Sequence, residues 1–145
     1  FFAPYCVDND RFAQAAEGLR AERPSIRQKW SVPEDAFTFL FCAKFEDKKR
    51  PLDLLAAVSR AVNELGMDQD RIHVLMVGDG QLRSVCEETV RGDGLAVTFA
   101  GFLNQTELVQ AYVASDCLVL PSDYGETWGL VVNEAMACGM PEILS

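Results

Sequence analysis

The chain has 145 residues, of which 49% are hydrophobic, and its formal net charge is −9. A chain of this length and composition is typical of one soluble globular domain and is too hydrophobic to stay disordered. The negative charge would repel a long polyanion such as DNA, so we expect no nucleic-acid partner.

The cysteines number five, form no CxxC pair, and in several cases lie inside apolar runs. A thiol in such a run behaves as a small hydrophobe, which favours a reducing, cytoplasmic setting over a disulfide or zinc framework. No stretch reaches the roughly 18 apolar residues of a membrane span. No cleavable signal peptide is visible, although a chain that starts at Phe1 gives no information on one that was removed.

Strand-like and helix-like patterns alternate along the chain. Residues 1–32 are interpreted as an interdomain linker, with a helix over 10–22 and a further turn up to Trp30, and residues 33–145 as the main domain. In the main domain, strands are predicted at 37–43, 72–77, 95–100, 116–121 and 143–144. The first of these is a continuous apolar run, as expected of a strand that is buried on both faces.

Helices are predicted between these strands. They cover 51–65, 81–91, 104–115 and 129–138. Pro51 suits the first turn of the first helix, and Asn104 followed by Glu107 forms a capping-box pattern at the start of the third. The alternation implies a parallel sheet with helices on both faces, which is an α/β, Rossmann-like doubly wound fold. No helix follows the last strand, so we expect the chain to stop inside the domain.

Ligands of an open parallel sheet bind beyond the carboxyl ends of its strands. Three predicted loops lie at that edge: residues 44–50, 78–80 and 122–128. The third leads into a helix near Gly129, whose first backbone N–H groups have no partner within the helix and whose dipole favours an anion. Glycine at this position also lets a phosphate approach the backbone closely.

Two carboxylates flank this helix start. Glu126 precedes it, and Glu134 lies about 7.5 Å beyond Gly129 along a helix that rises ~1.5 Å per residue. A diphosphate at the helix end would have one carboxylate on each side, with Glu126 holding sugar hydroxyls and Glu134 the ribose diol of a nucleotide sugar. Acidic residues near a helix N-terminus also stabilise it by about 0.3–1 kcal/mol with no ligand, and this structural explanation stays open.

Basic residues gather in the first loop, where Lys44 and Lys49 lie at the same edge as Gly129. Both could face one diphosphate and neutralise a leaving group. The alternative is that this charge run is a solvated face, as most such runs are.

Other features of the chain carry weaker signals. Phe102 follows the third strand and would either touch a base or belong to the core. The glycine turn at 78–80 is interpreted as structural and His73 as a packed residue. We see no Ser-His-Asp arrangement and no cluster of metal ligands, so no metal is expected.

Residues 43–141 resemble the C-terminal domain of GT-B glycosyltransferases with retaining stereochemistry, often called family 4. The matching elements, in chain order, are Ala43-Lys44-Phe45-Glu46-Asp47-Lys48-Lys49 against Gly-Arg-x-x-x-x-Lys, Val77-Gly78-Asp79-Gly80-Gln81-Leu82 against Val-Gly-Asp-Gly-Pro-Leu, Val97–Phe102, and Glu126 to Glu134 as E-x7-E followed by Ala135–Pro141. The last element is the most specific.

This resemblance implies roles for the two carboxylates and for the base-facing residue. Glu126 would be the catalytic residue that contacts the donor sugar, and Glu134 would contact the ribose. The exit of the third strand, at Phe102, would border the base.

The resemblance also implies a diphosphate site. Backbone amides near Gly129 and Leu130 would meet the diphosphate, and Lys44 and Lys49 would stabilise the departing nucleoside diphosphate. The family generally needs no metal ion or other cofactor. Lys44 stands where the family has Arg, which turns a bidentate phosphate contact into a point charge, and Ala43 stands where it has Gly.

The implied function is transfer of a sugar from a nucleoside-diphosphate donor to an unknown acceptor with retention of configuration. The acceptor-binding N-terminal domain would be missing, so the chain alone would be inactive, and any peripheral membrane association would come through that domain. Two alternatives stay open: a non-catalytic nucleotide-binding or regulatory α/β module, and an oligomeric fragment that associates through its exposed sheet edge.

Overall fold

A five-stranded parallel sheet forms the centre of the computed structural model, which describes residues 6–123 and 128–145. Its strands are β1 (Phe37–Cys42), β2 (Ile72–Val77), β3 (Val97–Gly101), β4 (Cys117–Leu120) and β5 (Glu142–Leu144). They lie in the order β3-β2-β1-β4-β5, and every adjacent pair is parallel. The predicted α/β, doubly wound sheet is confirmed.

The direction of winding reverses at β1. From β1 the chain adds β2 and then β3 on one side, crosses back, and adds β4 and β5 on the other side. The loops that follow β1 and β4 therefore leave the sheet next to each other. This is the topological switch point at which doubly wound folds bind their ligands.

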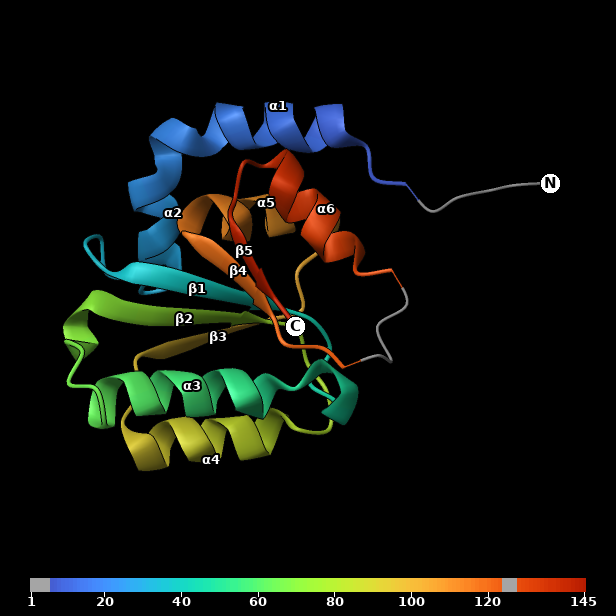
Figure 1. Cartoon of the computed structure of the whole chain (residues 1–145). Helices are drawn as coiled ribbons and strands as arrows, with labels where there is room; N and C mark the ends of the chain where they lie inside the picture. Colours follow the sequence, from blue (N-terminus) through green and yellow to red (C-terminus); the bar gives the residue numbers. More distant parts are fainter. Residues whose placement is uncertain (1–5, 124–127) are drawn as a thin grey trace.

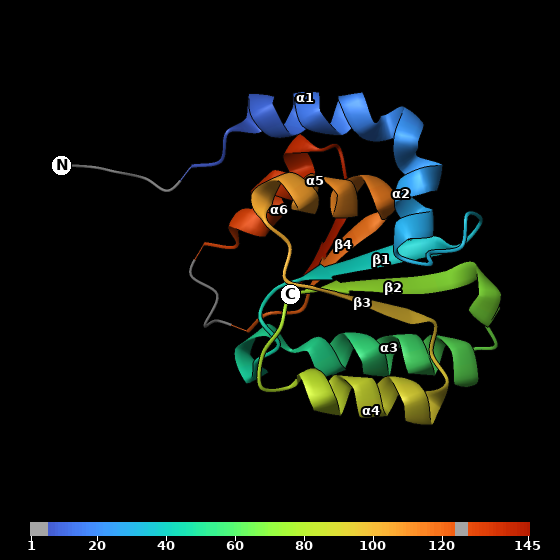
Figure 2. The same cartoon turned by 180° about the vertical axis from the view of Figure 1, so that it is seen from behind.

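The helices are divided between the two faces of the sheet (Figures 1 and 2). On one face lie α3 (Pro51–Asn63) and α4 (Arg83–Asp93), and on the other α1 (Asn9–Leu19), α2 (Arg23–Lys29), α5 (Gln105–Ala114) and α6 (Leu130–Ala137). Because parallel crossovers are right-handed, the reversal at β1 moves the later helices to the opposite face. Within the described ranges, no helix is long and apolar enough to cross a membrane.

Each face of the sheet packs into its own apolar core. Leu40 belongs to the core under α5 and α6, and its neighbour Phe41 to the core under α3 and α4. Successive side chains of a strand point to opposite faces, and both residues are fully buried because both faces are covered. All six residues of β2 are buried for the same reason.

The N-terminal helices share one of these cores. Phe12 of α1, Ile26 of α2 and the following Trp30 pack in the cluster that also contains Leu40 and Leu118 of the sheet. A short 3-10 turn over 20–22 joins the two helices, and Pro24 lies in the first turn of α2, where a missing N–H has no cost. Residues 9–29 are thus packed against α5 and α6.

Most predicted elements agree with the structure to within two residues at their ends. The capping box at the start of α5 is confirmed, because the Asn104 side chain accepts from the backbone of Thr106 and Glu107 while Glu107 reaches back to the Asn104 N–H. The third strand was predicted to start at Leu95 but begins at Val97. Leu95 instead donates its N–H to the carbonyl of Val90 and completes the end of α4.

Candidate functional site

Hydrogen bonds join the predicted loops at the carboxyl edge of the sheet. The Phe45 N–H donates to the Asp79 carbonyl at 3.0 Å, which links the loops after β1 and β2. The Asp123 N–H donates to the Lys48 carbonyl at 3.1 Å, which links the loops after β4 and β1. All three loops therefore form one connected edge, as the alternation of strands and helices predicted.

The glycine turn after β2 has a steric cause. A Cβ atom on Gly78 would lie 2.0 Å from the Ala43 carbonyl oxygen, and one on Gly80 would lie 2.6 Å from the Phe45 carbonyl oxygen. Their φ angles are +126° and +156°, which side chains rarely allow. These glycines let the turn press against the backbone around Lys44, which supports the structural interpretation of this motif.

The four basic residues of the first loop have different surroundings. The Lys48 ammonium lies 3.4 Å from Glu46, and the Arg50 guanidinium 2.7 Å from Asp53. Lys44 is exposed, and no ion pair or hydrogen bond joins its side chain to another residue in the described ranges. Lys49 is half-buried at the end of a short 3-10 turn over Asp47–Lys49. The ammonium of Lys44 therefore remains available to an anionic ligand.

The N-terminus of α6 opens onto a cavity. Gly129 precedes the helix in the left-handed conformation, with φ of 52°, and caps the helix without a side chain. The cavity has a volume of about 390 Å³ and lies between α6 and the ends of β4 and β5. It is lined by Leu120, Ser122, Trp128, Gly129, Val132, Asn133, Leu144 and Ser145. The predicted start of this helix is confirmed at Leu130.

The Glu134 side chain is directed toward the sheet. Its Oε2 accepts a hydrogen bond of 2.8 Å from the hydroxyl of Tyr112 on α5. Burial raises the pKa of the Cys42 thiol to about 12, and the nearby Glu134 carboxylate adds to this shift. Cys42 is the last residue of β1, so the Glu134 carboxylate lies close to the strand end from which the loop of Lys44 departs.

Of the predicted residues at the two ends of the ligand, the structure describes Phe102 but not Glu126. Glu126 lies outside the described residues. Phe102 directly follows β3 and is 84% exposed, so it is not part of either core. An exposed aromatic ring at the carboxyl edge provides a flat apolar surface against which a base can stack.

The sequence did not predict the hydrogen bond between Tyr112 and Glu134. Tyr112 lies on the apolar side of α5 with Val109, and such a tyrosine is more typical of a core than of a site. Burial and the neighbouring Cys42 and Glu134 raise its pKa far above the usual range, so its hydroxyl remains a hydrogen-bond donor. In the described parts of the chain, no group of three or more His, Cys, Asp and Glu residues could hold a metal ion.

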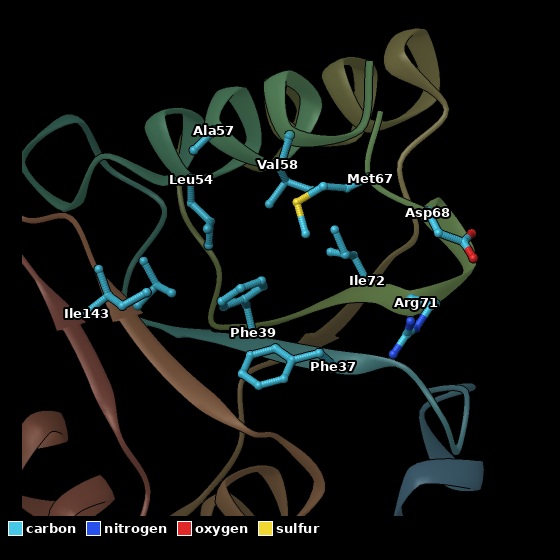
Figure 3. A pocket seen from close by; sticks show the side chains of 12 residues that line it. Phe37, Phe39, Leu54, Ala57, Val58, Met67, Asp68, Arg71, Ile72 and Ile143 are labelled. Atoms are coloured by element: carbon cyan, nitrogen blue, oxygen red, sulfur yellow. The ribbon is translucent and has the colours of Figure 1, made fainter. Parts of the chain in front are cut away.

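A larger cavity lies elsewhere. It has a volume of about 620 Å³ and lies between α3 and the sheet, where the side chains of Leu54, Val58 and Ile72 point into it (Figure 3). Its lining is almost entirely apolar, and its charged residues are Asp68 and Arg71. A diphosphate needs convergent hydrogen-bond donors, so this cavity does not suit a nucleotide. The smaller cavity at α6 has Gly129 in its lining, but the predicted side chains of Lys44, Lys49, Phe102 and Glu134 are not part of that lining.

A comparison with protein families decides the class. The sequence model of the family described as "Glycosyl transferases group 1" matches residues 22–145. The chain belongs to the group 1 glycosyltransferases. The match extends from the start of α2 to β5 and so includes the whole carboxyl edge.

Individual relatives of this group 1 chain are also glycosyltransferases. It is 34% identical over 144 residues to D-inositol 3-phosphate glycosyltransferase 2 of Catenulispora acidiphila, covering 94% of this chain and 32% of the relative. It is 31% identical over 123 residues to a GDP-mannose-dependent alpha-(1-6)-phosphatidylinositol dimannoside mannosyltransferase of Mycobacterium tuberculosis, covering 83% of this chain and 30% of that protein. The chain spans about a third of the length of these curated relatives.

Solved structures share the fold. The HepE protein of Anabaena, in complex with UDP and glucose, superposes with a TM-score of 0.73 at 22% identity over 86% of this chain and 33% of HepE. A glycosyltransferase of Rickettsia africae superposes with a TM-score of 0.77 at 20% identity over 95% of this chain and 36% of that one. At these identities the likeness establishes that the group 1 chain has the glycosyltransferase fold.

Proposed function

We propose that this chain is the donor-binding part of a retaining GT-B glycosyltransferase and that a nucleoside-diphosphate sugar lies along the carboxyl edge of its sheet. The observation that carries the proposal is the cavity at the N-terminus of α6, with the Glu134 carboxylate held toward the end of β1. Anion-binding amides and a hydroxyl-binding carboxylate then lie on one short helix. Membership of a glycosyltransferase family supports this chemistry.

The diphosphate is proposed to bind at the start of α6. Gly129 and Leu130 lie at the N-terminus of α6, where the helix dipole adds positive potential. Lys44 and Lys49 would add positive charge from the neighbouring loop. As the bond to the sugar breaks, negative charge develops on the departing nucleoside diphosphate, and these groups would stabilise that charge without moving.

The two ends of the ligand are assigned to the remaining residues. Glu134 would accept hydrogen bonds from the ribose, and Phe102 would lie against the base. Glu126 is proposed to contact the sugar as the catalytic residue. The Mycobacterium tuberculosis relative is named as GDP-mannose-dependent and HepE was solved with UDP, so GDP- and UDP-sugars are the donors to test first.

The acceptor is assigned to a part of the enzyme beyond this chain. The named relatives are about three times as long as their matched segments, which leaves room for an acceptor-binding domain. We propose that any membrane association would be peripheral and through that domain. The five free cysteines agree with a cytoplasmic, reducing setting.

Titration calorimetry tests the donor site. We expect the chain to bind UDP or GDP and to prefer one of them to NAD and AMP. Glu134→Ala should weaken that binding by about tenfold or more, because it removes hydrogen bonds between a charged acceptor and the ribose. Glu64→Ala, which removes an exposed carboxylate beyond the end of α3, is the matched control and should leave the affinity unchanged.

The non-catalytic module makes a different prediction. It would bind all four nucleotides alike, or none, and Glu134→Ala would have no effect. That result would remove the basis of the donor-site proposal, whereas a uridine or guanosine diphosphate preference that is lost with Glu134 would support it. The two sequence relatives named above are both glycosyltransferases, and neither of them favours the module.

A further inference from the structure

We propose that Tyr112 is a positioning residue for ribose recognition, acting by fixing the orientation of the Glu134 carboxylate. The inference rests on the proposed function, because it takes Glu134 as the residue that meets the ribose. Its basis is the 2.8 Å hydrogen bond from the Tyr112 hydroxyl to Oε2 of Glu134, which joins α5 to α6.

The hydrogen bond restricts a side chain that would otherwise be mobile. A glutamate has three rotatable side-chain bonds, and a half-buried one on a helix can adopt several rotamers. The side chain of a helical residue leans toward the helix N-terminus, which for Glu134 is the end that faces the proposed diphosphate site. The tyrosine hydroxyl selects, among these rotamers, one with Oε2 against α5.

Tyr112 is itself rigid. Its side chain is 2% exposed, and its ring packs edge to face against Phe12 of α1, with the ring centres 6.3 Å apart. A buried aromatic ring with two side-chain torsions keeps its hydroxyl in one place far better than a long polar side chain does. The position of the Glu134 carboxylate is therefore set by the packing of α1 and α5.

The hydrogen bond also determines what the carboxylate offers to a ligand. A carboxylate has about four acceptor sites on two oxygens. Tyr112 occupies one site on Oε2, which leaves Oε1 and the second site of Oε2 for the two hydroxyls of a ribose. A ligand that lacks one hydroxyl leaves a desolvated acceptor unpaired, and the site discriminates against it. Tyr112 thus contributes to ribose specificity without contacting the ribose.

The competing explanation is purely structural. A buried tyrosine hydroxyl needs a hydrogen-bond partner, and Glu134 provides one whether or not a nucleotide binds. Under that explanation, removal of the hydroxyl lowers the stability of the fold but leaves ribose selectivity unchanged. The ratio of affinities for a ribonucleotide and its 2′-deoxy analogue separates the two explanations, because a general loss of stability does not alter it.

The experiment uses Tyr112→Phe, which removes only the hydroxyl. Binding of UDP and 2′-deoxy-UDP, and of GDP and 2′-deoxy-GDP, is measured by calorimetry well below the thermal midpoint of each variant. We expect Tyr112→Phe to reduce the ribose preference by about three- to tenfold, because a less ordered carboxylate loses part of its hydrogen bonding to the ribose. Phe12→Leu keeps the hydroxyl but loosens the ring, and should reduce the preference in the same direction by less.

Thr98→Val is the matched control. Like Tyr112, Thr98 has a side-chain hydroxyl that joins two elements: its Oγ1 donates a 2.8 Å hydrogen bond to the Trp30 carbonyl. Thr98 lies outside the proposed site. Loss of its hydroxyl should lower the thermal midpoint and leave the ribose preference unchanged. This variant shows what removal of a merely structural hydroxyl does in the same fold.

The outcomes distinguish failure of the role proposed for Tyr112 from failure of the assignment of Glu134 to the ribose. If Glu134→Ala abolishes the ribose preference while Tyr112→Phe and Phe12→Leu keep it, Tyr112 is not a positioning residue and the donor site stands. If Glu134→Ala itself leaves the preference unchanged, the assignment of Glu134 to the ribose is wrong. A double variant, Tyr112→Phe with Glu134→Ala, should show no loss of preference beyond that of Glu134→Ala alone, because Tyr112 acts through Glu134.

Discussion

The backbone N–H of Asp123 donates a 3.1 Å hydrogen bond to the carbonyl oxygen of Lys48, so the loop that follows β4 is fastened to the loop that follows β1. These loops leave adjacent strands at the point where the sheet reverses its direction of winding. One carries Lys44 and Lys49, and the other leads to Gly129. The Asp123 end of the second loop is therefore held next to the first loop by a main-chain hydrogen bond.

The close approach of the β2 loop to this region predicts a strong effect of Gly78→Ala. The new Cβ atom would meet the Ala43 carbonyl oxygen at 2.0 Å, and φ of +126° would be strained. We expect the free energy of unfolding to fall by about 2–4 kcal/mol, because both the loop and the end of β1 must shift. Urea denaturation measures the loss.

Gly92→Ala is the control for this substitution. Gly92 lies within α4, and a Cβ atom there would meet nothing within 4 Å. Alanine should stabilise the helix by about 0.5–1 kcal/mol. Equal effects of the two substitutions would show that the contact between the β2 loop and Ala43 is not tight in solution.

Removal of the Asp116 carboxylate should destabilise the packing of α2 on the sheet. Its Oδ2 lies 2.8 Å from the Arg27 guanidinium, and the Arg27 side chain is only 3% exposed. Asp116→Ala leaves this buried charge without its carboxylate and should cost about 3–5 kcal/mol of unfolding free energy. Glu64→Ala breaks an exposed pair with Arg60 and should cost about 0.5 kcal/mol or less, so similar losses would contradict this account.

Much of the fold could be predicted because local patterns and the final structure agree. β2 was predicted with its observed ends because a strand covered on both faces is apolar along most of its length, with His73 as the exception here, and the start of α5 was fixed by Asn104 and Glu107. The start of β3 was predicted two residues too early, at Leu95. An apolar residue after a glycine suits a strand start, but here Gly94 adopts the left-handed conformation that ends α4, and Leu95 packs as part of that ending.

Part of the candidate site could likewise be predicted from the sequence, and part of it could not. That Lys44 and Gly129 lie at one edge follows from alternation alone, because all parallel strands end at the same side. The order of the strands, and with it the adjacency of the two loops, depends on long-range packing that no local pattern encodes. The contact between Tyr112 and Glu134 likewise requires α5 and α6 to lie together, so neither residue's own surroundings in the sequence could reveal it.

The lowered pKa of His73 predicts that the fold loses stability in mild acid. Burial, assisted by the charge of Arg27, lowers the pKa of this side chain from 6.5 to about 4. Between these values the unfolded chain binds a proton that the folded chain does not, so the stability falls as the pH drops from about 6.5 to 4. The full shift corresponds to about 3.5 kcal/mol at ~1.4 kcal/mol per pKa unit.

Urea denaturation at several pH values, with and without His73, tests this prediction. His73→Gln retains an N–H that can reach the Thr98 hydroxyl, which lies 3.0 Å from His73 Nε2, but it does not titrate. The variant should lose less stability than the parent chain over this pH window. If the free energy of unfolding falls equally with pH in the variant and the parent chain, groups other than His73 control the response to acid.

Lys44 offers the sharpest test of the phosphate site, because its ammonium has no partner elsewhere in the described residues. We expect Lys44→Ala to weaken the binding of UDP or GDP by about three- to tenfold at low salt, and by less as salt screens the charge. Binding of the parent nucleoside, which carries no phosphate, should not change. Lys48→Ala, in the same loop but paired with Glu46, is the matched control and should have a smaller effect.

Lys44→Arg tests the same site in the opposite direction. A guanidinium can donate two parallel hydrogen bonds to a phosphate where an ammonium acts as a point charge, so this substitution should tighten diphosphate binding by about two- to fivefold. Calorimetry against UDP and GDP, with the nucleosides as references, measures the change. If neither Lys44→Ala nor Lys44→Arg alters diphosphate affinity, Lys44 faces solvent alone, and the positive charge at this edge must come from Lys49 and the N-terminus of α6.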